Sequence, residues 1–187
     1  MHRRTFLKIT LPAALTGYAG AAESDLPLIS FGVIADPQYA DVKSAGSRHY
    51  RDSLGKLKGA VAELNKHDLK FVVTLGDVID RDIASFNDIM PIYKTLKAPR
   101  RFVLGNHDFT VDDKDKDKVL GHLDMKNGYH AESAGDWHFI YLDGTDVSTY
   151  RHPKDSAETA SAKEVLGKMK QEKRKNAVPW NGALGAK

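Results

Sequence analysis

Three short polar motifs carry the side chains of this chain that are best suited to chemistry. They read Asp36-Pro37-Gln38, Gly76-Asp77-Val78-Ile79-Asp80 and Gly105-Asn106-His107-Asp108. Hydrolysis of a phosphate ester or anhydride at neutral pH needs charge neutralisation and a strong nucleophile. Two divalent ions about 4 Å apart supply both by holding a bridging hydroxide and the phosphoryl oxygens. Such ions are bound by hard oxygen atoms and by imidazole, which are the groups that these motifs contain.

The residue types within the motifs indicate separate roles. His107 could donate a proton to the leaving oxygen of a phosphate ester. Asp80 is near enough in sequence to orient that imidazole and to favour its charged form. The candidate metal ligands are Asp36, Gln38, Asp77 and Asn106.

Each motif closes an apolar segment of strand length, and helical segments separate the strands. The expected strands span 28–35, 69–75 and 101–104, and near-continuous apolar runs of this kind are typical of strands buried on both faces. Apolar residues recur at helical spacing over 47–67 and again over 86–96, where Pro91 is expected to kink the second helix or to start its second part. This order predicts an α/β fold with a parallel sheet, in which ligands bind at the carboxyl ends of the strands.

The rest of the chain is less regular. Residues 112–118 alternate in charge, which predicts a solvated loop. Two short apolar segments, 129–132 and 137–142, are joined by 133–136 and favour a β-hairpin. Residues 156–176 are rich in lysine and glutamate and favour a surface helix.

The N-terminus has the features of a secretory signal. A charged start is followed by a short apolar stretch over 9–19 and by Ala19-Gly20-Ala21. The adjacent Arg3 and Arg4 resemble a twin-arginine export signal, which predicts a signal peptide over 1–21 and a bacterial periplasmic protein. The alternatives are an ordinary secretory signal and an uncleaved amphipathic segment. Contact with a membrane is then expected only during passage through the export machinery.

The charge balance argues against nucleic acid as a partner. The net charge of +3 comes from 28 basic and 25 acidic residues, and loss of the signal would remove three basic residues and no acidic one. No basic stripe remains to neutralise phosphates of nucleic acid. The chain contains no cysteine, which excludes disulfides and thiolate zinc sites. Nothing in the sequence indicates an oligomeric state.

The three motifs resemble those of the calcineurin-like metallophosphoesterase superfamily, over roughly residues 28–145. The resemblance implies the four-layer α/β/β/α sandwich, in an incomplete domain over 27–187. It also implies that Asp36 and Gln38 bind a first metal ion, that Asp77 bridges, and that Asn106 binds a second. His107 would be the general acid or a stabiliser of the transition state, paired with Asp80.

Gln38 occupies a position where most members of the superfamily have histidine. This substitution, with Arg48-His49-Tyr50-Arg51 and Trp180-Asn181-Gly182, is similar to the manganese-dependent ADP-ribose/CDP-alcohol diphosphatase subgroup. That resemblance implies two divalent ions, Mn²⁺ first with iron or zinc as alternatives, and a small nucleotide-linked diphosphate as substrate. Arg81 either grips phosphate, as in the phosphoprotein phosphatase branch, or is a surface arginine.

The superfamily pattern also requires three histidines after the third motif. The chain offers four there, none in the expected setting: His122, His130, His138 and His152. We therefore expect a chain truncated at its C-terminal side, with part of one sheet face exposed and little activity in the chain as given. Alternatives are a phosphomonoesterase or cyclic-nucleotide phosphodiesterase with the same site, and a non-catalytic exported remnant.

Overall fold

The computed structural model describes residues 29–171. The signal expected at 1–21 and the motif that begins at Trp180 lie outside the described residues. Within the described residues, no helix combines the length and the apolar character that a bilayer-spanning segment needs.

A three-stranded parallel sheet forms the centre of the molecule. Its strands are β1 (Gly32–Ile34), β2 (Val72–Leu75) and β3 (Arg100–Val103), in the order β1-β2-β3. In the register, Val33 lies beside Val73, which lies beside Arg101. The predicted parallel α/β layer is therefore confirmed. The assigned strands are shorter than the apolar segments, although the Lys70 N–H still donates to the Ser30 carbonyl at 2.8 Å.

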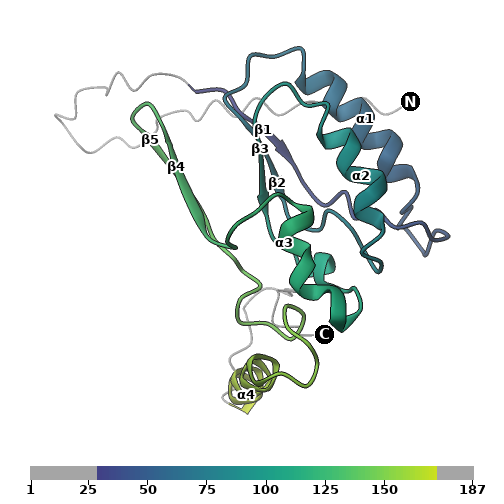
Figure 1. Ribbon diagram of the computed structural model, residues 1–187, viewed down its shortest axis with the longest axis vertical. Coiled ribbons are helices and arrows are strands. Elements are labelled where there is room, and N and C mark those ends of the chain that lie inside the picture. Colours follow the sequence, from purple (N-terminus) through teal and green to yellow (C-terminus); the bar gives the residue numbers. More distant parts are fainter. Residues whose placement is uncertain (1–28, 172–187) are drawn as a thin grey trace, which may run out of the picture.

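Two helices cover one face of this sheet, as Figure 1 shows. They are α1 (Asp52–Leu64) and α2 (Ser85–Tyr93), and both are shorter than their apolar periodicity predicted. Tyr50 continues the apolar face of α1 but lies in the loop before it, and Pro91 lies inside the last turn of α2. The core between helices and sheet includes Leu57, Phe86 and Ile89, which are at most 3% exposed.

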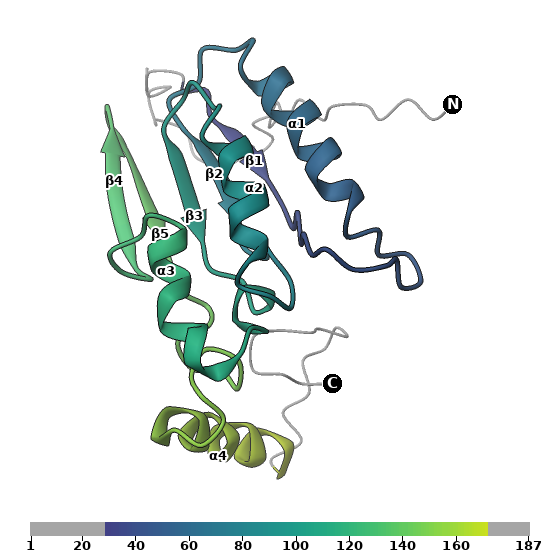
Figure 2. The same cartoon turned by 45° about the vertical axis from the view of Figure 1, so that its right-hand side comes forward.

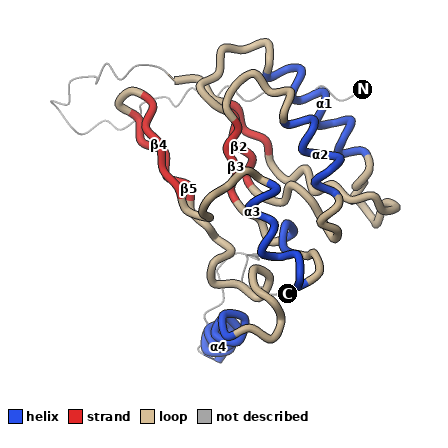
Figure 3. The backbone as a smooth tube through the Cα atoms, viewed as in Figure 1, coloured by secondary structure: helices blue, strands red, loops and turns tan. Residues whose placement is uncertain are grey.

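The predicted hairpin is confirmed and lies across the other face of the sheet (Figure 3). It consists of β4 (His130–Ala134) and β5 (Trp137–Tyr141), joined by a tight turn in which Gly135 has a φ of 59°. Phe71 of the segment before β2 meets Phe139 of β5 edge to face, with ring centroids 4.8 Å apart. The Arg101 guanidinium donates two hydrogen bonds to the Glu132 carboxylate, from Nε to Oε1 at 2.7 Å and from Nη2 to Oε2 at 2.5 Å.

The hairpin leaves part of its sheet face uncovered, so the expectation that the strands are buried on both faces is wrong. Val33 and Leu75 are each 50% exposed, whereas Val73 between them is 6% exposed. The outer side of the hairpin is also open, with Ile140 72% and Leu142 65% exposed. The exposed apolar face that we expected is therefore present.

The segments after the third motif include η1 (His107–Phe109), η2 (Asp113–Lys118), α3 (Val119–His122) and α4 (Ala157–Gln171). The solvated loop expected at 112–118 is wrong in part. Asp115 and Lys116 are buried there, and the Lys116 ammonium donates to the His152 carbonyl at 3.0 Å. The helix expected at 156–176 is present over the described residues as α4, which lies beyond α3 and apart from the sheet (Figure 2).

Candidate metal centre

The loops that follow β1 and β2 run side by side, joined by backbone hydrogen bonds. The Gln38 N–H donates to the Asp77 carbonyl at 2.7 Å, and the Tyr39 N–H donates to the Val78 carbonyl at 3.1 Å. A third hydrogen bond runs in the opposite direction, because the Asp80 N–H donates to the Tyr39 carbonyl at 2.8 Å. The first two motifs therefore meet at one edge of the sheet, as the order of strands predicted.

The third motif joins them through a close approach of two glycines. A Cβ on Gly105 would lie 2.2 Å from both the backbone nitrogen and Oδ1 of Asp77. A Cβ on Gly76, whose φ is 76°, would lie 2.8 Å from the Gly105 Cα. Only glycine therefore fits either position, and the His107 N–H can donate to Asp77 Oδ1 at 2.8 Å.

Asp108 joins the second and third motifs from inside, a role that its position in the sequence does not indicate. This residue is fully buried. Its Oδ1 accepts the N–H groups of Val78 and Ile79 at 2.7 and 3.1 Å, and its Oδ2 accepts that of Gly105 at 3.0 Å. Burial raises the pKa of Asp108 to about 7, although the three N–H donors act in the opposite direction.

Three candidate ligands have left-handed backbone conformations. The φ angles are 46° at Asp36, 49° at Gln38 and 49° at Asp77. In a residue other than glycine, this conformation destabilises the fold by about 1–2 kcal/mol, and the surrounding hydrogen bonds must offset that cost. Strained residues of this kind gather at functional sites, and here all three occupy loops at the same sheet edge.

The candidate ligands present oxygen atoms that other protein groups do not use. Within residues 29–171, the side chains of Asp36, Gln38 and Asn106 have no hydrogen-bond or ion-pair partner, and Asp77 keeps Oδ2 available. The same residues contain no group of three or more His, Cys, Asp or Glu side chains suited to a metal ion. Two carboxylates and two amides instead make an all-oxygen set, which fits a hard divalent cation such as Mn²⁺ or Mg²⁺.

His107 lies beside Asp80, as the motifs predicted. The Nδ1 atom is 3.2 Å from Asp80 Oδ1, in a direction poor for a linear hydrogen bond. Thr110 donates its hydroxyl proton to the same oxygen at 2.9 Å and was not identified from the sequence. Burial acts to raise the pKa of Asp80, but the contacts with His107 and Thr110 outweigh it and lower that pKa. Asp80 therefore remains charged beside the imidazole.

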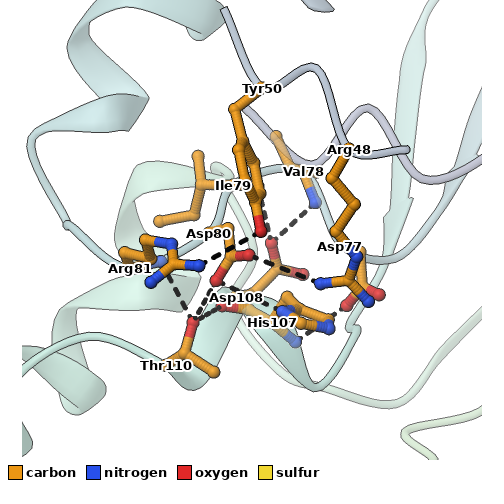
Figure 4. Close-up of polar contacts among 10 residues, drawn as sticks. All are labelled: Arg48, Tyr50, Asp77, Val78, Ile79, Asp80, Arg81, His107, Asp108 and Thr110. Atoms are coloured by element: carbon orange, nitrogen blue, oxygen red, sulfur yellow. Dashed lines mark hydrogen bonds and ion pairs between the residues drawn. The ribbon is translucent and has the colours of Figure 1, made fainter. Parts of the chain in front are cut away.

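Two arginines approach this pair from outside, Arg81 through a contact with Tyr50 and Arg48 through a contact with Asp80 (Figure 4). Arg81 Nη2 donates to the Tyr50 hydroxyl at 3.2 Å, and the guanidinium carbon lies 5.3 Å from the centre of the Tyr50 ring. Arg48 Nη1 lies 3.9 Å from Asp80 Oδ2. Hydrogen bonds from Arg81 and then Arg48 lower the pKa of Tyr50. The two arginines make this side of the site positive.

The rings of three of the four later histidines contact groups other than the candidate ligands, and the fourth, His152, accepts a hydrogen bond through its backbone carbonyl. His122 stacks on Phe86 and His130 stacks on Tyr141, at centroid distances of 5.0 and 4.1 Å. The ring of His138 contacts the Ser133 hydroxyl within the hairpin. These rings have structural partners of their own, so the described residues supply four candidate ligands and no imidazole among them.

Several known proteins are similar to this chain. A diphosphatase of Arabidopsis thaliana is 29% identical, over 86% of this chain and 60% of its own length. A protein of the same name from Oryza sativa subsp. japonica is 30% identical, over 92% of this chain and 62% of its own length. A protein of the same name from Homo sapiens is 28% identical, over 78% of this chain and 52% of its own length. All three are named manganese-dependent ADP-ribose/CDP-alcohol diphosphatase, and this chain spans about 60% of the length of the plant proteins.

The fold also matches a solved structure. A dimetal phosphatase from Danio rerio superposes with a TM-score of 0.65, at 22% identity, over 82% of this chain and 56% of that protein. The sequence pattern of the calcineurin-like phosphoesterases matches residues 29–182, which includes all three motifs. The chain therefore belongs to the calcineurin-like phosphoesterase family.

Proposed function

We propose that this protein hydrolyses phosphodiester or diphosphate bonds with the help of divalent metal ions, Mn²⁺ in first place. Small nucleotide-linked diphosphates such as ADP-ribose and CDP-alcohols are the proposed substrates. The family, the names of the plant and human relatives, and the dimetal phosphatase of similar fold support this proposal. The proposed ligands are Asp36, Gln38, Asp77 and Asn106, with Asp77 as the bridging carboxylate.

One observation carries the proposal. The loops after all three parallel strands meet around Asp77, whose backbone carbonyl contacts Gln38 and whose carboxylate contacts the third motif. Burial raises the pKa of Asp77, with the nearby Asp36 carboxylate as a smaller cause. A carboxylate whose pKa is raised by burial and by a neighbouring carboxylate is stabilised in its charged form by a nearby cation. A bound ion would supply charge neutralisation and an activated water at this edge.

His107 is the proposed proton donor. Its Nδ1 lies 3.2 Å from Asp80 Oδ1, so the ring is held with Nε2 as the nitrogen that can carry the proton to be transferred. When the bond between phosphorus and the bridging oxygen breaks, Nε2 can protonate the leaving oxygen. The Thr110 hydroxyl holds Asp80 in place through this step.

Metal binding by the 187-residue chain is the first test. Electron paramagnetic resonance of free Mn²⁺ should show binding to the wild type, with affinity at least about tenfold weaker in Asp77→Asn because a charged ligand is removed. Asp68→Asn is the matched control, since Asp68 is exposed and remote from the motifs. Equal affinity in wild type and Asp77→Asn would contradict the proposed site.

Substrate preference is the second test. We expect slow turnover, because the described residues supply only four candidate ligands for two ions. Rates with ADP-ribose and CDP-choline in Mn²⁺ should exceed those with cyclic AMP and p-nitrophenyl phosphate. Calorimetry should also detect Mn²⁺-dependent binding of ADP-ribose. Preferred cleavage of either of the last two compounds would favour the phosphomonoesterase or phosphodiesterase alternative.

Export to the periplasm is part of the proposal and rests on residues 1–21 alone. Replacing Arg3 and Arg4 together with lysine should retain the protein in the cytoplasm of a bacterial host, because twin-arginine transport depends on that pair. Cell fractionation measures the outcome. Unchanged periplasmic recovery would favour an ordinary secretory signal.

A further inference from the structure

A pocket of about 360 Å³ lies between the loop after β1 and the first half of α1. Its volume falls in the range of roughly 300–1,000 Å³ that is usual for small-molecule sites. Asp36 and Gln38 form one wall, so the pocket opens directly onto the candidate metal ligands. The opposite wall is one face of α1, which contributes Ser53, Lys56 and Leu57 at helical spacing.

The basic groups that line this pocket differ in what they already contact. Arg48 faces the Asp80 carboxylate at 3.9 Å, and His49 Nδ1 lies 3.2 Å from the Ser44 hydroxyl. Lys56 is exposed and forms no hydrogen bond or ion pair with another residue in the described range 29–171. Lys56 is therefore the lining cation that is free to bind a ligand.

We propose that Lys56 binds the phosphoryl group of a diphosphate that is not attacked, and that it thereby favours diphosphates over monophosphates. The inference rests on the proposed function, in which the ligands around Asp36 hold the attacked phosphoryl group. A diphosphate places a second anionic group beside the first, and the α1 wall offers it an ammonium donor. A monophosphate at the metal ligands has no second group to present to Lys56.

Calorimetry with the 187-residue chain can measure this preference without turnover. The probes are α,β-methylene-ADP, whose bridging carbon prevents cleavage, and AMP, each titrated with Mn²⁺ and again in EDTA. Lys56→Gln should weaken binding of the diphosphate about fivefold and that of AMP less than about twofold, because one charged hydrogen bond is lost. Lys56→Arg should keep the preference. Lys58→Gln, an exposed lysine of α1 outside the pocket lining, should behave as the wild type.

The outcomes separate this inference from the function on which it rests. Normal Mn²⁺ binding with equal losses for both nucleotides, or with no loss, overturns the role of Lys56 and leaves the metal site standing. Absent Mn²⁺ binding contradicts the proposed function. In that case the titrations in EDTA still test the role of Lys56. A preference for the diphosphate over AMP that decreases in Lys56→Gln supports this role, and an unchanged preference overturns it.

Discussion

The loops at the carboxyl edge of the parallel sheet and the hairpin β4–β5 are attached to that sheet in different ways. The loops are bound by backbone hydrogen bonds, by a buried carboxylate and by two glycines in contact. The hairpin is attached by a cluster of aromatic rings and by one side-chain ion pair, and it leaves Val33 and Leu75 half exposed. The contacts that shape the site are therefore the least tolerant of change, whereas the hairpin contacts serve mainly stability.

The largest effect is expected from Asp108→Ala in the loops. Removing the carboxylate leaves three buried N–H groups without an acceptor, which should lower the free energy of unfolding by roughly 3–4 kcal/mol. Urea denaturation measures the change. Asp112→Ala alters an exposed carboxylate on the same segment and should stay within about 0.5 kcal/mol. Similar losses in the two variants would contradict the internal role of Asp108.

Gly105→Ala should have the next largest effect on stability, and it should also weaken metal binding directly. The new Cβ would overlap the Asp77 backbone and carboxylate, so we expect about 2–3 kcal/mol of destabilisation and at least about tenfold weaker Mn²⁺ binding. Gly121→Ala places a Cβ in open space on α3 and should affect neither property. Unchanged Mn²⁺ affinity in a folded Gly105→Ala protein would show that the close approach is not required.

Glu132→Gln tests the attachment of the hairpin. It weakens the contact with Arg101, so we expect a loss of about 1–2 kcal/mol at pH 7. The hydrogen bond from Arg101 leads the causes that lower the pKa of Glu132 below its ordinary value of 4.5. A carboxylate whose pKa is lowered by folding stabilises the fold at pH values above its ordinary pKa. This contribution disappears as the pH falls through the folded-state pKa.

The difference in stability between wild type and Glu132→Gln should therefore be full above about pH 5 and should vanish in stronger acid. Denaturation at a series of pH values measures it. Glu164→Gln removes the exposed pair with Lys168 on α4 and should leave the stability almost unchanged at any pH. A difference that persists in acid would mean that packing, and not charge, attaches Glu132.

Leu75→Thr on the uncovered sheet face should have the smallest effect on folding. Half of this side chain already contacts water, and threonine suits a strand, so we expect a change within about 1 kcal/mol. Light scattering should show less self-association, because an exposed apolar group is lost. A cost near 3 kcal/mol would mean that another group covers Leu75 in solution.

Much of the site could be predicted from the sequence because its residues follow apolar segments directly. The parallel layer, the hairpin and the pairing of His107 with Asp80 were predicted and are present. The role of Asp108 was missed, because an aspartate in a turn gives no sign of pointing inward to accept N–H groups from another loop. Lys56 was missed as well, since a lysine on a helix is in most cases only a solvated charge.

The sequence by itself determined which chemical groups reach the sheet edge and in what order, because periodicity sets strands and helices and each strand end delivers its motif. Only the tertiary structure decided the left-handed backbone of Asp36, Gln38 and Asp77, the contact between Gly76 and Gly105, and the half-exposed Val33 and Leu75. These features depend on contacts between segments about 30 residues or more apart in the chain, which no local pattern encodes.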